Sequence, residues 1–152
     1  MTSKKPVELL IGYARQNPTL EAAKAKAMFG RFMSGGFSYD EISNSPDLPA
    51  YASAEVLATI LPLMIEEMLA RQDTGNFLIY PMIAAVDPSG EGKAWMAERT
   101  EELAKLVDHR VAEKILELLT AARVDPPVPI ERLDRIFAFW KNRAGPSVPS
   151  SQ

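Results

Sequence analysis

The lone histidine, His109, is the residue best suited to acid–base chemistry, and the sequence gives it no obvious partner. Its neighbour Asp108 cannot pair with it across a helix, because consecutive helical residues point about 100° apart. Cysteine is absent, which excludes disulfides, cysteine-based zinc sites, iron–sulfur clusters and a thiol nucleophile. We therefore interpret His109 as a half-exposed helix residue and predict no catalytic residue, metal or cofactor.

Glutamates in predicted helices are the second group that could carry chemistry. A ferritin-like di-iron site needs two Glu-x-x-His motifs, and one histidine cannot provide them. Glu113 and Glu117 share a helix face with basic residues, which is typical of a solvated, salt-bridged surface. An enzyme would instead need carboxylates that converge from separate helices, with Glu66 or Glu98 against apolar walls and its pKa raised. This remains an alternative function.

The segment Gly90–Lys93 looks like the end of a phosphate-binding loop. It lacks the first glycine at the required spacing, and Ala94 stands where a serine or threonine would bind magnesium. We therefore predict no nucleotide site, and interpret the two glycines as a flexible entrance to the next helix.

Basic residues near the C-terminus lie among aromatic ones, an arrangement that can bind nucleic acid. Interleaved acids leave this segment only weakly positive, and the net charge of the chain is −3. We expect Phe137 and Trp140 to pack in the core, and we predict no nucleic-acid partner. The basic residues concerned are Arg132, Arg135, Lys141 and Arg143.

Phe37, Tyr39, Asp40 and Glu41 combine two aromatic and two acidic side chains between predicted helices. Aromatic residues carry much of the binding energy at protein interfaces, and acids attract a basic partner. We therefore predict these four as partner-binding residues. Replacing Tyr39, Asp40 and Glu41 together by alanine should then weaken binding by several kcal/mol.

Helical periodicity, with glycine and proline at the breaks, predicts an all-α chain. Pro6–Gln16 and Thr19–Met33 read as a helical hairpin. Ser53 can cap a long apolar helix, Ala54–Arg71, which belongs at the centre of the domain and which Pro62 should kink or divide. One face of the second hairpin helix is predicted to carry Leu20, Ala23, Ala27 and Gly30.

Two later segments allow alternatives. Residues 77–86 fit a buried strand or a buried helix, and helix is favoured because no second strand is available to pair with it. Residues 91–122 form one long helix, or two that meet near Asp108, a good N-cap. Pro129 then opens a last helix that runs to Arg143.

The chain has 152 residues, of which 47% are apolar and 24% charged, which fits one globular domain. We predict a single domain over residues 1–144, an irregular orthogonal bundle of about six helices, followed by a disordered Pro/Ser tail, 145–152. No secretory signal follows Met1, and the longest apolar stretches are too short for a membrane span of about 20 residues. A cytoplasmic protein without a membrane partner is the simplest interpretation.

Two stretches resemble a family of small, all-helical bacterial proteins of unknown function. They are Leu48–Tyr51 before an apolar helix, and Glu98-Arg99 leading to Ile115–Leu119. The resemblance implies a helical fold and transfers no activity, cofactor or residue role. In general type the chain is also similar to the immunity proteins that neutralise bacterial toxins, since it is small, acidic and free of cysteine.

The leading hypothesis is a non-enzymatic module that binds another protein. In its immunity-protein form, the chain would occlude the active site of a toxin with an acidic and aromatic surface. Two alternatives stay open, namely the enzyme with converging carboxylates and a homodimeric scaffold joined through Phe77–Val86.

Overall fold

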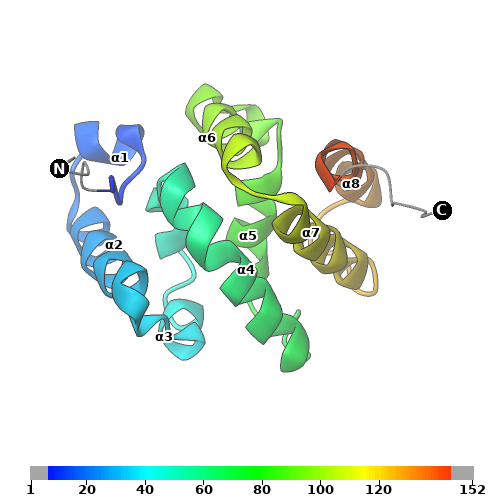
Figure 1. Ribbon diagram of the computed structural model, residues 1–152, viewed down its shortest axis with the longest axis horizontal. Coiled ribbons are helices and arrows are strands. Elements are labelled where there is room, and N and C mark those ends of the chain that lie inside the picture. Colours follow the sequence, from blue (N-terminus) through cyan, green and yellow to red (C-terminus); the bar gives the residue numbers. More distant parts are fainter. Residues whose placement is uncertain (1–6, 145–152) are drawn as a thin grey trace, which may run out of the picture.

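A computed structural model describes residues 7–144, so residues 1–6 and the predicted tail lie outside the described part. Eight α-helices and no strand occur within it, which confirms the predicted all-α bundle (Figure 1). The expected number of about six was too low because the region 91–122 forms two helices and a five-residue helix forms at Tyr39–Ser43. The helices are α1 (Gly12–Gln16), α2 (Leu20–Arg31), α3 (Tyr39–Ser43), α4 (Ala54–Ala70), α5 (Ile79–Val86), α6 (Ala94–Leu106), α7 (His109–Ala122) and α8 (Ile130–Ala144).

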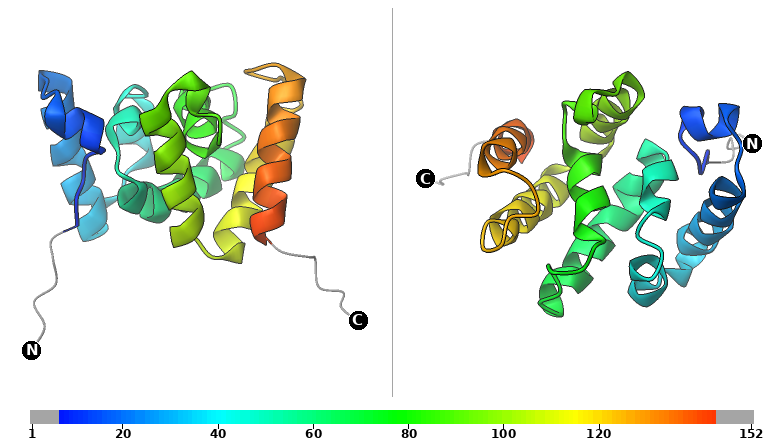
Figure 2. Two further views of the ribbon diagram at one scale, coloured as in Figure 1. Left: turned by 90° about the horizontal axis from the view of Figure 1, so that it is seen from above. Right: turned by 180° about the vertical axis from the view of Figure 1, so that it is seen from behind.

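Helix α4 is central, with α1–α3 on one side and α7 and α8 on the other (Figure 2). Ser53 caps it, because its Oγ accepts a hydrogen bond from the Val56 N–H at 3.2 Å. The helix runs through Pro62 without dividing, so the expected division is absent. Burial of each large side chain contributes roughly 1.5–3 kcal/mol, which makes α4 the main source of core stability. The large side chains that it buries are Val56, Leu57, Ile60, Leu61, Met64, Ile65 and Met68.

The segment 77–86 is helical, as favoured from the sequence, with α5 starting at Ile79. Asn76 precedes it and accepts a hydrogen bond from the Leu78 N–H at 2.9 Å. At its other end the Val86 carbonyl accepts a 2.7 Å bond from the indole N–H of Trp140, which is fully buried. This bond fixes α8 to α5 and confirms the core position predicted for Trp140.

The region 91–122 forms two helices that meet at Asp108. The Asp108 carboxylate accepts hydrogen bonds from the backbone N–H groups of Arg110 and Val111, at 3.0 and 3.1 Å. These bonds hold the pKa of Asp108 below its ordinary value, since they favour the charged form. His109 is an exposed residue of the first turn of α7.

The Asp108 cap predicts a specific pH dependence of stability. Because the folded pKa is lower than the unfolded one, the stabilisation is complete above the unfolded value of 3.8 and is lost as the pH falls through the folded pKa. We expect Asp108→Asn to be less stable than wild type at pH 7. The two melting curves should converge in acid, and a constant difference between them would contradict the ionised cap.

The start of the chain differs from prediction, because only α1 of the expected Pro6–Gln16 helix forms. The residues before it are extended and pair with the segment that leads into α4. The Ile11 N–H donates to the Tyr51 carbonyl at 2.8 Å, and the Ser53 N–H donates to the Leu9 carbonyl at 3.1 Å. These long-range bonds replace the local helical ones.

The buried face of α2 is not the face that carries Leu20, Ala23 and Ala27. Leu20 is 75% exposed, while Met28 and Phe29 are in the core. Alanines lie on both sides of this helix, so their spacing could not identify the buried face. The two bulky residues, Met28 and Phe29, are the better guide.

Among the described residues, no helix combines the length and apolar character that crossing a membrane requires. Several methionines fill the core, and Met64, Met68 and Met82 are at most 1% exposed. Their flexible side chains fill the irregular gaps between helices that cross at different angles.

Candidate functional site

The segment predicted to bind a partner is folded into the core and into ion pairs. Tyr39 is only 4% exposed, and its hydroxyl donates to the Asp73 carboxylate at 2.8 Å. Phe37 is partly buried, with its ring edge to face with Phe32 at 5.1 Å. Phe37 therefore packs against Phe32 and Tyr39 bonds to the turn after α4, which leaves little of Tyr39 for a partner, and partner binding by this segment stays a prediction.

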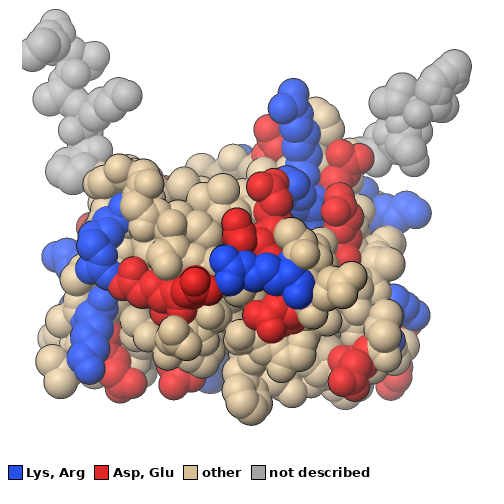
Figure 3. Space-filling view, turned by 90° about the horizontal axis from the view of Figure 1, so that it is seen from below, with Lys and Arg blue, Asp and Glu red and all other residues tan. Residues whose placement is uncertain are grey.

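The two acids of this segment are already paired within the molecule. Asp40 accepts a hydrogen bond from Arg71 at 2.6 Å, and Glu41 pairs with Arg31. Acidic and basic side chains lie interspersed on the face of the molecule in Figure 3. Such pairs reduce the charge that these acids offer to a partner.

Tyr39 gives a test of this structural role. Burial is the main reason why the pKa of Tyr39 lies well above its ordinary value of 10.0, and the hydrogen bond to Asp73 raises it further. Tyr39→Phe should lose one hydrogen bond and about 1 kcal/mol of stability at pH 7. In wild type this tyrosine makes stability fall as the pH rises above about 10, because the unfolded chain ionises first. Urea unfolding at pH 7 and pH 11 should show that this pH-dependent loss is smaller in the variant.

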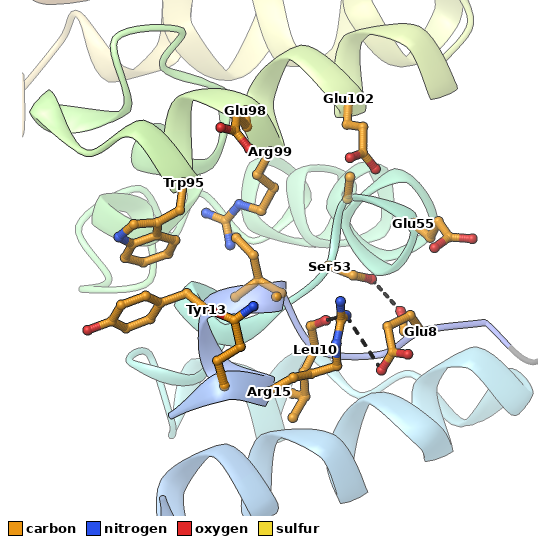
Figure 4. Close-up of a pocket in the computed structure, with 14 residues that line it drawn as sticks. Glu8, Leu10, Tyr13, Arg15, Ser53, Glu55, Trp95, Glu98, Arg99 and Glu102 are labelled. Atoms are coloured by element: carbon orange, nitrogen blue, oxygen red, sulfur yellow. Dashed lines mark hydrogen bonds and ion pairs between the residues drawn. The ribbon is translucent and has the colours of Figure 1, made fainter. Parts of the chain in front are cut away.

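A cleft of about 560 Å³ lies between the extended start of the chain, the first turn of α4 and helix α6 (Figure 4). Ser53 stands in it, and its hydroxyl donates to the Glu8 carbonyl at 2.6 Å, which holds the start of the chain against α4. The charged and aromatic side chains that line the cleft are Glu8, Tyr13, Arg15, Glu55, Trp95, Glu98, Arg99 and Glu102.

An aromatic pair forms one side of this cleft. The rings of Tyr13 and Trp95 stack with centroids 4.7 Å apart and planes 8° apart. Tyr13 is half exposed at 50%, and Trp95 is partly buried. The pair joins α1 to α6 and presents aromatic surface to the cleft.

Glutamates line much of the rest of the cleft, and most of them have no partner among the described residues. Glu55, Glu98 and Glu102 are exposed and make no ion pair within residues 7–144. Glu8 is 3.6 Å from Arg15, which also donates to the Leu10 carbonyl at 2.7 Å. The charged lining of the cleft is therefore mainly acidic beside the aromatic pair.

Arg99 extends into the interior beneath Trp95 and is 4% exposed. Its Nη1 donates to the carbonyls of Ala50 and Ala52, each at 3.0 Å, and to that of Pro49 at 3.4 Å. Burial lowers the pKa of Arg99 to about 10. These bonds satisfy carbonyls at the end of a short 3-10 helix, Leu48–Tyr51, that precedes α4.

No family model matches the chain. No curated protein and no solved structure matches it either. The assignment of this site therefore depends on its geometry alone.

The two glutamates named for an enzyme are both exposed. Glu66 pairs with Lys114 at 3.1 Å, and Glu98 lies on the rim of the cleft. Neither is enclosed by apolar walls, which is the environment that the enzyme hypothesis requires. Within the described residues, no three histidine or acidic side chains are grouped so that they could hold a metal ion.

The basic residues near the C-terminus are partly used within the molecule. Arg132 donates to Asp87 at 2.8 Å and to Glu91 at 3.1 Å, and Arg143 lies 3.8 Å from Glu101. These ion pairs reduce the positive charge that this surface offers to nucleic acid.

The cleft was not predictable from the sequence, because its residues come from three separate segments. Trp95 could have indicated one part of the cleft from the sequence. It lies three residues before Glu98, which lies four residues before Glu102, so the three side chains share one side of α6. No sequence pattern indicates a role for Tyr13, because its contact with Trp95 joins residues that are far apart in the sequence.

Proposed function

We propose that the protein is a non-enzymatic binding module that receives a basic segment of a partner protein in this cleft. The observation that carries the proposal is the pairing of exposed glutamates with a half-exposed aromatic stack. Carboxylates attract an arginine or lysine, and the half-exposed ring of Tyr13 can stabilise the same cation through the face that is not stacked on Trp95. An acidic and aromatic surface was expected at Phe37–Glu41, and the proposal places it at the cleft instead.

Neutralising the cleft should abolish capture of the partner. We would compare tagged wild type with the triple variant Glu55→Gln, Glu98→Gln and Glu102→Gln in lysates of the source cells. Glu113→Gln, Glu117→Gln and Glu131→Gln together form the matched control, because these exposed glutamates lie on α7 and α8. We expect wild type and control to retain one stoichiometric partner, and the cleft variant to lose at least about 90% of it. Equal retention by all three proteins would exclude the cleft.

A bacterial immunity function in the cytoplasm is the specific form of this proposal. The partner would then be a toxin with a basic groove, and the chain would act by occluding it. A standard interface of this kind buries about 800 Å² on each partner. Co-expression with the captured partner should restore growth in wild type and fail in the cleft variant. A captured partner that is harmless when expressed alone would contradict this form.

Self-association is a second candidate, supported by Phe77 and Tyr80. Their rings stack with centroids 6.4 Å apart, and they are 73% and 48% exposed. An exposed aromatic pair at the start of α5 suits an interface between two copies. Light scattering at millimolar concentration tests it, and a monomer there would exclude the scaffold function.

A further inference from the structure

A second, smaller hollow lies next to the cleft and shares Trp95 and Arg99 with it. Its volume is about 230 Å³. It is walled mainly by apolar and aromatic side chains, but the charged residues in its lining are mostly basic. The residues that line it are Ala50, Tyr80, Pro81, Ala84, Glu91, Lys93, Trp95, Met96 and Arg99.

We propose that this hollow binds a small carboxylate with an apolar body, held by Arg99 and Lys93. The hollow adjoins the cleft of the proposed protein partner and shares Trp95 and Arg99 with it, but the partner would contact the glutamates of the larger cleft, whereas the carboxylate would contact the cations.

Arg99 is the main reason to expect an anion. It is 4% exposed, and no carboxylate lies within 4.0 Å of it among residues 7–144. Only Nη1 donates to described residues, and the enclosed Nε has no acceptor among them. Buried guanidinium groups are ordinarily paired, because removing a lone charge from water is costly. A carboxylate would supply the missing counter-charge, and the planar donors of arginine suit it.

Lys93 supplies a second cation at the mouth of the hollow. It is exposed, has no ion pair with a described residue, and places its Nζ 6.0 Å from the centroid of the Trp95 ring. Glu91 is the acid in the lining, and Arg132 pairs with it at 3.1 Å. The field in the hollow is therefore positive on balance.

The size and the walls of the hollow favour a small ligand with an apolar part. At about 30 Å³ per water molecule, the volume corresponds to roughly eight waters, which fits a ligand of about ten non-hydrogen atoms. The aromatic faces of Trp95 and Tyr80 and the side chain of Met96 suit a ring or a short alkyl group. Inorganic phosphate would lose more hydration here without using these walls.

Benzoate is a suitable probe, with the indole N–H signals of the full-length protein as the readout. Trp95 lines the hollow, whereas Trp140 is fully buried and bonded to Val86. We expect benzoate to shift the Trp95 signal with a dissociation constant of about 1 mM, and to leave the Trp140 signal nearly unchanged. Trp95→Phe assigns the two signals.

Three other ligands separate the sources of affinity. Benzamide has the same shape without the charge and should bind at least about tenfold more weakly. Benzylammonium and inorganic phosphate should produce no saturable shift below about 10 mM. Three results would overturn the proposal. Equal binding of benzamide would show a generic apolar hollow, and equal binding of phosphate would show a generic anion site. The third result is the absence of a benzoate shift.

Lys93→Gln should weaken benzoate binding by about fivefold without affecting the fold, because Lys93 is exposed. The matched control is Lys105→Gln, an exposed lysine in the last turn of the same helix, which should leave the affinity unchanged. Equal effects of the two substitutions would indicate long-range charge rather than a site. Arg99→Lys, if it folds, should weaken binding by at least about tenfold, since an ammonium cannot form two parallel bonds to a carboxylate.

Discussion

Replacing Gly90 by alanine is expected to destabilise the protein by about 2–4 kcal/mol. Gly90 has a φ of +61°, which costs an alanine about 1 kcal/mol. A Cβ built there would also lie 2.4 Å from the backbone nitrogen of Ala97 and 2.9 Å from its Cα. Overpacking against backbone of this kind adds roughly 1–3 kcal/mol, because α6 would have to move.

Gly92 provides the matched control for this prediction. Its φ is +81°, but a Cβ there would meet nothing within 4 Å. Gly92→Ala should therefore cost only the conformational term, about 1 kcal/mol. Urea unfolding of both variants measures the difference, and equal losses would show that α6 does not pack against Gly90 as described. The two glycines were expected to form a flexible entrance to α6. Gly90 instead lies in close contact with the backbone of α6.

Arg99→Met is expected to destabilise the protein by up to about 3 kcal/mol. Removing the buried charge of Arg99 works in the opposite direction, because it stabilises the folded protein. The pKa of Arg99 is about 10 instead of 12.5, and this difference corresponds to a desolvation penalty of about 3 kcal/mol. The loss is larger, since charge-assisted hydrogen bonds contribute roughly 1.5–3 kcal/mol each. Three carbonyls lose their Arg99 donor, and the two bonds at 3.0 Å account for most of the effect.

Arg135→Met is the control for this substitution, because Arg135 is exposed on α8. Its effect should stay within about 0.5 kcal/mol of wild type. Stabilisation by Arg99→Met would show that the desolvation penalty exceeds the hydrogen bonds. Thermal and urea unfolding of both variants at pH 7 give the comparison.

Helices with a strong local pattern were predictable from the sequence. In α7, Ile115, Leu118 and Ala122 recur at helical spacing and are buried, with Asp108 as the cap. Prediction failed where distant segments compete with local bonds. Val7–Ile11 has a helical pattern, yet its backbone bonds with the segment before α4, and no local signal reports this pairing.

The candidate site was not predictable for a related reason. Tyr39 was predicted to contact a partner because it lies between predicted helices, whereas the Asp73 carboxylate that accepts its hydroxyl bond comes from the turn after α4. Trp95 and Tyr13 come together only when α1 packs near α6. The residue types in the sequence suggest an acidic and aromatic surface. The sequence does not report the long-range contacts that decide where such a surface can form.

Carboxyl footprinting of the complex with the captured partner tests the central claim most directly. A water-soluble carbodiimide and an amine label exposed carboxylates, and mass spectrometry measures each site with and without the partner. We predict that labelling of Glu55, Glu98 and Glu102 falls at least about fivefold in the complex, while that of Glu113 and Glu117 is unchanged. Unchanged labelling at the cleft, with protection at the other glutamates, would contradict the account.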